Sequence, residues 1–434
     1  MRADQPNRRR TCIHIFGLFV VAVVLRLLYL LLACDNLGFD QFSRYAPDTN
    51  IYLIIRDHIL SWQEMGAYGL LRFGPGYGLI LAGLGAIFGC DLLWPILLNI
   101  LLGGLAPVFV YLLAWQLLSS RPVALLAGAF SAVSLTSVAL SCHILTDQPF
   151  FTFHAAALVC FVRGYKTGRV GWYIAAGLIA GCAACIRPVG QITLVVFFLF
   201  ALVLPVTRMY RSRRAFVSRA GISALLVLLV LLGWSTRNYV IHDLFVFGTN
   251  GVYTLRSAVV TKVAEQTRGE GKKQLDYRRE WEEEDNDWKP GDYQDQYRRA
   301  KARVVNEVKN NPGPMTRQFL FNLQENMVER NSYPDRQIPQ VRSVMGVLNN
   351  AVRNWLGYLI IAVTLLGLAL LRRNDHRAAA WLLGLTYAGF SILVGCSTWQ
   401  GSRLHYPAEM AWSIVVAFVA VGAWCRLQGR RRTD

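Results

Sequence analysis

Long apolar runs are the feature that most restricts how this 434-residue chain can fold. Ten of them have 16 to 25 residues, close to the length at which an α-helix crosses about 30 Å of hydrocarbon. The sequence therefore predicts an all-α polytopic membrane protein with about ten transmembrane helices. The predicted spans are residues 12–34, 94–118, 122–142, 148–163, 171–186, 189–206, 216–236, 353–371, 378–396 and 408–425.

An eleventh apolar run, FGPGYGLILAGLGAIFG at residues 73–89, is placed by the distribution of basic residues. Counting it as a span would move the later segment TRMYRSRRAF to the side opposite the basic amino terminus, against the positive-inside bias. The run is also short and rich in glycine, so we predict a helix in the outer interface. Both termini are then cytoplasmic, and residues 35–93 form one outer loop with two surface helices.

The rest of the chain divides around a second outer segment, residues 235–352, which holds 16 of the 27 Asp and Glu residues. This polar composition predicts a small ordered lid or domain between a transmembrane catalytic module (1–234) and the carboxyl-terminal helices with their basic tail (353–434). Its acidic run EWEEEDNDW, residues 280–288, is typical of a solvated helix face rather than a cation site.

The net charge of +18 does not indicate nucleic-acid binding, because the basic residues lie between the apolar runs rather than on one soluble face. Anionic membrane lipids are the expected partners of these charges. The basic opening segment with its long apolar run predicts an uncleaved signal anchor. Cys182 and Cys185 form a CxxC pair inside an apolar helix, where it favours neither zinc nor redox chemistry.

Ionisable residues gather where the predicted spans reach the outer side. Guanidinium groups match phosphate, and a carboxylate can accept a proton from a hydroxyl, so the set suits transfer from a lipid phosphate. The competing interpretation is that the arginines reach out to lipid head groups while the carboxylates cap helices. The set comprises Asp48, His143, Asp147, Arg187, Arg237 and Arg403.

The stretch RYAPDTNIYLIIRDHIL (44–60) predicts a surface helix with isoleucines toward lipid and Asp48 near its start. Its Arg56, Asp57 and His58 are expected on the solvated face. Within the first span, Arg26 either pairs with an acid of the bundle or extends to the interface. His143 and Asp147 could share a helix face, but a metal site usually needs three or four donors, so they do not predict one.

Six motifs, in order along the chain, resemble the GT-C superfamily of integral-membrane glycosyltransferases. The similarity is greatest to the bacterial branch related to dolichyl-phosphate-mannose protein mannosyltransferases (glycosyltransferase family 39) and lipid A aminoarabinose transferases. The motifs are PDTNIYLIIRDHIL, LRFGPGYGLILAGLGAIFG, SRPVALLAGAFSAVSLTSVALSCHILTDQPF, GLIAGCAACIRPVGQITL, GWSTRNYVIHDLFVFGTNGVY and GSRLHYPAEMAW. Two positions depart from the family pattern: Gly76-Tyr77-Gly78 stands where tyrosine is usually followed by proline, and Gly233 instead of proline precedes Trp234.

The resemblance implies a role for each matching residue. Asp48 would be the general base that activates the acceptor hydroxyl, and Asp147 the second acidic residue, which positions acceptor or base. The lipid phosphate would be held by Arg187, Arg237 and Arg403. Supporting residues would be Tyr52, Arg72, His143 and Tyr406.

Members of the superfamily take a sugar from a polyprenyl-phosphate donor and invert its anomeric centre. The expected partners are such a donor and a glycan, lipid or protein acceptor, with the site on the extracytoplasmic side. The charge pattern suits a bacterial inner membrane, and an endoplasmic-reticulum membrane would show the same pattern. No cofactor is required because the phosphate is already a fair leaving group, although some members use a divalent cation. The alternatives are a lipid or sugar transporter or flippase, a non-catalytic scaffold, and a ligase with a diphosphate-linked donor. No repeat is visible, which favours the enzyme over a transporter.

Overall fold

The computed structural model of the chain describes residues 8–61, 67–203, 213–286, 293–328, 337–338, 350–373, 376–397 and 402–430. Every regular element within these ranges is a helix. The first part of the chain forms α1 (Arg8–Leu37), α2 (Phe39–Ser43), α3 (Thr49–Ser61), α4 (Ala67–Phe73), α5 (Gly76–Phe88), α6 (Leu93–Leu118), α7 (Arg121–Val133), α8 (Leu135–Ser141), α9 (Asp147–Thr167), α10 (Val170–Ile186), η1 (Pro188–Gln191), α11 (Ile192–Val203) and α12 (Arg213–His242). The remainder forms α13 (Asn250–Leu255), η2 (Arg256–Val260), α14 (Thr261–Thr267), α15 (Gln274–Asn286), α16 (Tyr293–Asn310), α17 (Pro312–Val328), α20 (Asn350–Arg373), α21 (Arg377–Gly395), α22 (Ser402–His405), η3 (Tyr406–Ala408) and α23 (Glu409–Arg430).

Each of the ten predicted spans falls on one or two of these helices, although residues 204–206 of the span 189–206 lie outside the described ranges. Six described helices are long and apolar enough to cross a membrane, and the bent pair α7 and α8 would make a seventh. The predicted interfacial run forms α5, whose 13 residues extend about 20 Å, less than a hydrocarbon core of about 30 Å. The all-α membrane fold is confirmed, whereas the number of spans stays a prediction.

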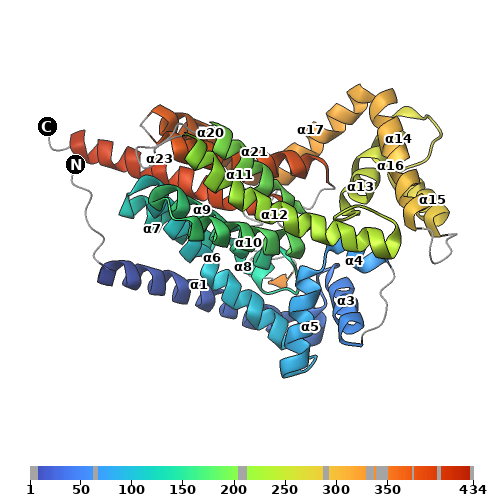
Figure 1. Cartoon of the computed structure of the whole chain (residues 1–434), viewed down its shortest axis with the longest axis horizontal. Helices are drawn as coiled ribbons and strands as arrows, with labels where there is room; N and C mark the ends of the chain where they lie inside the picture. Colours follow the sequence, from blue (N-terminus) through green and yellow to red (C-terminus); the bar gives the residue numbers. More distant parts are fainter. Residues whose placement is uncertain are drawn as a thin grey trace.

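Helix α9 is central to the bundle, where it packs against both α6 and α10. Its rings Phe150, Phe151 and Phe161 are fully buried. The helices α1 and α23 place their chain-terminal ends at one end of the bundle, and α3, α5 and the helices α13 to α16 lie at the other (Figure 1). The polar start of α9 is therefore covered on several sides by other helices.

Glycines let α5 approach two neighbours closely. A Cβ on Gly78 would lie 2.2 Å from Ile55 of α3, and a Cβ on Gly76 would lie 2.6 Å from the backbone nitrogen of Ile186 at the end of α10. The Gly-Tyr-Gly departure from the family pattern thus has a packing role here. It brings the first outer loop against the end of α10.

The expectation that Arg56 lies on the solvated face of α3 is wrong, because Arg56 is only 7% exposed. Its Nε donates to Asp57 Oδ1 over 2.7 Å, and its Nη1 donates to the Cys90 carbonyl over 3.2 Å. These two acceptors satisfy the guanidinium where α3 packs against α5 and the chain that follows it. Asp57 itself is exposed, as expected.

The described part of the second outer segment is helical and has a small core of its own. Ala258, Val259, Val263, Tyr277 and Trp281 are buried together in it. The acidic run 280–288 falls partly on α15, and its residues 287 and 288 lie outside the described ranges. The division of the chain at residues 234 and 352 stays a prediction.

Candidate active site

Asp147 is the centre of the candidate site and the first residue of α9. Its side chain is fully buried. The start of a helix carries a partial positive charge, which favours a carboxylate there. Burial of an ionised carboxylate is costly unless cations and hydrogen-bond donors compensate for the lost water.

Arg187 provides one of these cations. Pro188 disfavours helical geometry for the residue before it, so α10 ends at Ile186 and Arg187 has an extended backbone with φ −144° and ψ 120°. This turn directs its side chain to the start of α9, where Nη1 donates a short hydrogen bond to Asp147 Oδ1. Arg187 thus pairs with a residue that lies 40 positions earlier in the chain.

Arg403 provides the second cation, from the short helix α22. Its Nη2 donates to Asp147 Oδ2 over 3.2 Å and to Asp48 Oδ2 over 2.7 Å. The side chain of Arg403 is 8% exposed, whereas that of Asp48 is 32% exposed. One guanidinium therefore bridges a buried carboxylate and an accessible one.

Asp48 is held in place by the first turn of α3, whose Tyr52 backbone N–H donates to the Asp48 carbonyl. Thr49 Oγ1 donates to the Ile144 carbonyl over 3.3 Å, and the Tyr52 hydroxyl lies 3.2 Å from Thr146 Oγ1. Burial raises the pKa of Tyr52, and the neighbouring Asp48 carboxylate raises it further. The neutral phenol thus fixes α3 to the turn that precedes Asp147.

The carboxylate–arginine cluster consists of Asp48, Asp147, Arg187 and Arg403. Its two negative and two positive charges balance in this structure. The structure therefore brings together four of the five residues that the sequence suggested for catalysis and phosphate binding. Their positions at helix ends explain how residues from four distant parts of the chain meet.

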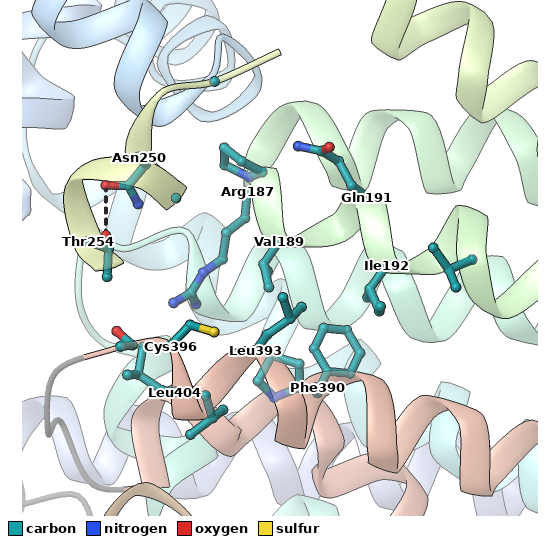
Figure 2. A pocket seen from close by; sticks show the side chains of 17 residues that line it. Arg187, Val189, Gln191, Ile192, Asn250, Thr254, Phe390, Leu393, Cys396 and Leu404 are labelled. Carbon is teal, nitrogen blue, oxygen red and sulfur yellow. Dashed lines mark hydrogen bonds between the residues drawn. The ribbon is translucent and has the colours of Figure 1, made fainter. Parts of the chain in front are cut away.

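Arg187 also lines a pocket of about 450 Å³. Apolar side chains of η1, α11 and α21 form one part of its wall, including Val189, Ile192, Phe390 and Leu393. Figure 2 shows the Arg187 side chain extending into this space, with Asn250 and Thr254 on one side and Val189 and Ile192 on the other. Of the four cluster residues, Arg187 is the one that lines this mainly apolar pocket.

Arg237 is the one predicted phosphate ligand that the structure places elsewhere. Its guanidinium lies over the ring of Trp234, 4.9 Å from the centroid, and Nη1 donates to Asn238 Oδ1 over 3.0 Å. Both partners belong to α12, which continues past Arg237 to His242. Arg237 is thus inside a helix rather than at its end.

The supporting residues lie around the cluster. Arg72 donates from Nε to Asn250 Oδ1 over 3.3 Å and so connects α4 to the lining of the pocket. The Tyr406 hydroxyl donates to Gln148 Oε1 over 2.6 Å. His143 is fully buried beside Gln337, with 2.9 Å between the two side-chain nitrogens. Burial lowers the pKa of His143 to about 4, although its hydrogen bond with Gln337 acts in the opposite direction.

Sequence reasoning missed three amides near these residues. Gln148 accepts hydrogen bonds from Tyr406 and Ser141, and Gln337 contacts His143. Asn99 Nδ2 lies 2.6 Å from the His143 carbonyl, 3.2 Å from the Leu145 carbonyl and 3.0 Å from the Tyr77 hydroxyl. The amide of Asn99 in the apolar run of α6 was a usable signal, because polar side chains inside spans commonly bond across helices.

Within the described ranges, no three His, Cys, Asp or Glu side chains lie together in an arrangement that could hold a metal ion. The carboxylates that a cation would use, Asp48 and Asp147, are bonded to arginines.

Residues 73–234 match the family model of dolichyl-phosphate-mannose-protein mannosyltransferases. This part of the chain includes Asp147 and Arg187 but neither Asp48 nor Arg403. No curated protein sequence matches the chain at a significant level.

Solved structures of an oligosaccharyltransferase from the archaeon Archaeoglobus fulgidus are similar to the whole chain. The form tethered with an acceptor peptide containing the NVT sequon has a TM-score of 0.57 and 13% identity, over 99% of this chain and 51% of that one. The AglB complex with an inhibitory peptide and a dolichol-phosphate has a TM-score of 0.57 and 14% identity, over 96% and 51%. This chain therefore spans about half the length of those proteins. The GT-C fold that the sequence motifs predicted is confirmed.

Proposed function

We propose that this protein transfers a sugar from a polyprenyl-phosphate donor to an acceptor hydroxyl, on the extracytoplasmic side of a bacterial inner membrane. The observation that carries the proposal is that Arg187, which is paired with Asp147 in the carboxylate–arginine cluster, lines a mainly apolar pocket. A polyprenyl phosphate matches such a pocket, because its apolar chain can contact the apolar wall while its negative phosphate contacts the arginine. The A. fulgidus complex with dolichol-phosphate lends support through a protein of the same fold.

In this proposal, the isoprenoid occupies the wall formed by Val189, Ile192, Phe390 and Leu393. Its phosphate meets Arg187 in the pocket and then Arg403, which shares Asp147 with Arg187. Guanidinium groups bind phosphate oxygens in pairs, so they would stabilise the charge that grows on the leaving phosphate. Arg237 has no part in this arrangement.

Asp48 is the residue that we propose as general base, because it is the more accessible of the two carboxylates. The acceptor oxygen attacks the anomeric carbon, the carbon–oxygen bond to phosphate breaks, and its electron pair stays on the phosphate. The acceptor proton passes to the Asp48 carboxylate. Asp147 remains paired and orients the arginines.

The ion pair between Arg403 and Asp48 suggests the order of the steps: the donor binds before the acceptor is deprotonated. Arg403 Nη2 donates to Asp48 Oδ2 over 2.7 Å, so this oxygen is not available to the acceptor proton while Arg403 is bonded to it. A donor phosphate that binds Arg403 competes for the same N–H groups and frees Asp48. The base would therefore become active when the donor is bound, before the acceptor is deprotonated.

The decisive experiment is sugar transfer by purified protein from a panel of polyprenyl-phosphate sugars to an extract of envelope glycans, lipids and proteins. We expect Asp48→Asn to lower kcat by about 100-fold or more, because general base catalysis contributes about 10²–10⁴. The matched control is Asp57→Asn, a change of the same chemistry at an exposed position of α3. Equal turnover by the two variants would exclude Asp48 as the base.

The same assay separates the enzyme from a transporter. An enzyme releases lipid phosphate in proportion to the sugar transferred, whereas a flippase moves the intact donor across a vesicle bilayer. Movement of donor without release of lipid phosphate, across the whole panel, would overturn the proposed function.

A further inference from the structure

Arg26 lies in the first span, yet it neither extends to the interface nor joins any ion pair of the described residues. Its side chain is 0% exposed. Nε donates to Ser141 Oγ over 2.9 Å, Nη2 donates to Ser137 Oγ over 2.7 Å, and Nη1 donates to the Ala22 carbonyl over 2.9 Å. A buried cation bonded to neutral oxygens is costly in a membrane and commonly has a functional reason.

The surrounding helices are built to receive this guanidinium. A Cβ on Gly103 of α6 would lie 2.4 Å from both Arg26 Nε and Ser141 Oγ, so only glycine leaves room there. The chain bends by 53° between α7 and α8, where Ser134 caps the new helix by accepting from the Ser137 backbone nitrogen. Because of this bend, α8, which carries both serines, runs in a different direction from α7.

The two serines connect Arg26 to the active-site residues. Ser137 Oγ lies 2.9 Å from the Tyr406 hydroxyl, which donates to Gln148 Oε1 over 2.6 Å. Ser141 Oγ lies 3.0 Å from the same Gln148 oxygen. The network therefore ends at Gln148, which follows Asp147 directly, and at Tyr406, which lies three residues after Arg403.

We propose that Arg26 is a positioning residue that sets the distance between Asp147 and Arg403 through Ser137, Ser141, Gln148 and Tyr406. Along the branch from Arg26 through Ser137 and Tyr406 to Gln148, each hydroxyl can accept from one neighbour and donate to the next, so the fixed cation gives this branch one preferred direction. The single proton of Ser141 Oγ is shared between Gln148 Oε1 and the Ser137 carbonyl, which is 2.6 Å away. The role of Arg26 in turnover rests on the proposed function above. Its role in ordering the segments that contain Asp147 and Arg403 does not rest on that function.

The first measurement is therefore amide hydrogen exchange of the purified protein without substrate. We expect Arg26→Met and Ser137→Ala to increase exchange in peptides that cover residues 143–148 and 402–408. The matched control is Ser223→Ala, because Ser223 is also a fully buried serine that bonds across helices, to the Tyr173 carbonyl over 2.7 Å. Unchanged exchange in the first two variants would overturn the proposal.

The second measurement is the split between KM and kcat. Small misplacement of reacting groups costs about 10- to 100-fold in rate, so Arg26→Met should lower kcat by this factor while the donor KM stays close to that of the unchanged protein. Arg26→Lys should recover part of the loss, and Tyr406→Phe, which removes one hydroxyl without a cavity, should lower kcat about fivefold. Ser223→Ala should have the kcat of the unchanged protein.

Two outcomes separate the proposals. Increased exchange with a kcat equal to that of Ser223→Ala would show that the network has no role in the reaction, and would overturn the positioning role. If the unchanged protein transfers sugar from no donor, the proposed function fails, while the exchange measurement still decides whether Arg26 orders the two segments.

Discussion

Gly76 offers a sharp test of how α5 positions Arg187, the residue that we propose as a phosphate ligand. A Cβ at Gly76 would lie 2.6 Å from Ile186 N and 2.7 Å from Cys185 C. Ordinary contact begins at 3.4 Å, so Gly76→Ala requires a shift of 3.4 minus 2.6, or about 0.8 Å. The obstructing atoms are backbone, and a rotamer change cannot relieve the contact. The shift must therefore move α5 or the end of α10, where Arg187 follows Ile186.

Overpacking of this kind costs about 1–3 kcal/mol, and a displacement near 1 Å at a reacting group can cost about 100-fold in rate. We expect Gly76→Ala to lower the Tm in detergent and to lower kcat/KM for the donor about 10- to 100-fold. Gly83→Ala is the control on the same helix, because nothing lies within 4 Å of a Cβ there. It should keep normal activity, and the gain of helix propensity is about 0.5–1 kcal/mol. Equal Tm and kcat/KM in the two variants would refute the close approach of α5 to α10.

Three further predictions concern the phosphate, the lipid chain and pH. Arg187→Lys should raise the donor KM about tenfold in steady-state assays, because lysine lacks the paired N–H groups that bind phosphate; an unchanged KM would argue against phosphate binding there. Leu393→Trp narrows the pocket and should raise KM for long-chain donors more than for short-chain ones, so an equal effect on both would place the lipid elsewhere. The pKa of His143 is lowered to about 4 in the folded protein, against about 6.5 when unfolded. This shift contributes about 3 kcal/mol to the free energy of unfolding, which is present above pH 6.5 and is lost as the pH falls toward 4. In thermal melts from pH 7.5 to pH 5, His143→Gln should therefore lose less Tm than the unchanged protein, and an equal loss in the two proteins would contradict this prediction.

The sequence predicted the helices and the cluster well for one physical reason. Asp48, Asp147, Arg187 and Arg403 each lie where an apolar run begins or ends, and in a membrane the limits of such runs are usually near the ends of helices. Ends on the same side of the membrane share one thin layer, so residues that are far apart in sequence become candidates for contact. Arg403 and Asp48 meet in this way across 355 positions.

The same reasoning failed for Arg237. It also lies where an apolar run ends, but α12 continues five residues beyond it to His242. Backbone hydrogen bonds continue a helix whether or not its side chains are apolar, so the end of hydrophobicity and the end of a helix differ here. A residue five positions before the end lies about 8 Å away from it along the axis. Arg237 accordingly contacts its own helix instead of the carboxylates.

Arg56 shows a different limit of sequence reasoning. Helical spacing correctly placed a surface helix at α3, but it could not tell which polar residue would face a second helix. The answer depends on Gly78, whose missing Cβ lets α5 lie against Ile55, and on the carbonyl of Cys90 that receives the guanidinium. Such contacts are set by two separate segments jointly, and periodicity within one segment contains no information about the other.

The surroundings of Arg26 could not be predicted from the sequence for the same reason, because several separate segments form them. Its position in an apolar run predicted either an acidic partner or a reach to the interface, since these are the usual ways to lower the cost of a buried cation. A third way needed a bend between α7 and α8, a glycine in α6 and two serines at one helical turn's spacing. None of these features stands out alone, because small residues are common in membrane helices. Together they hold Gln148 and Tyr406, which lie next to the residues that a donor phosphate would have to reach.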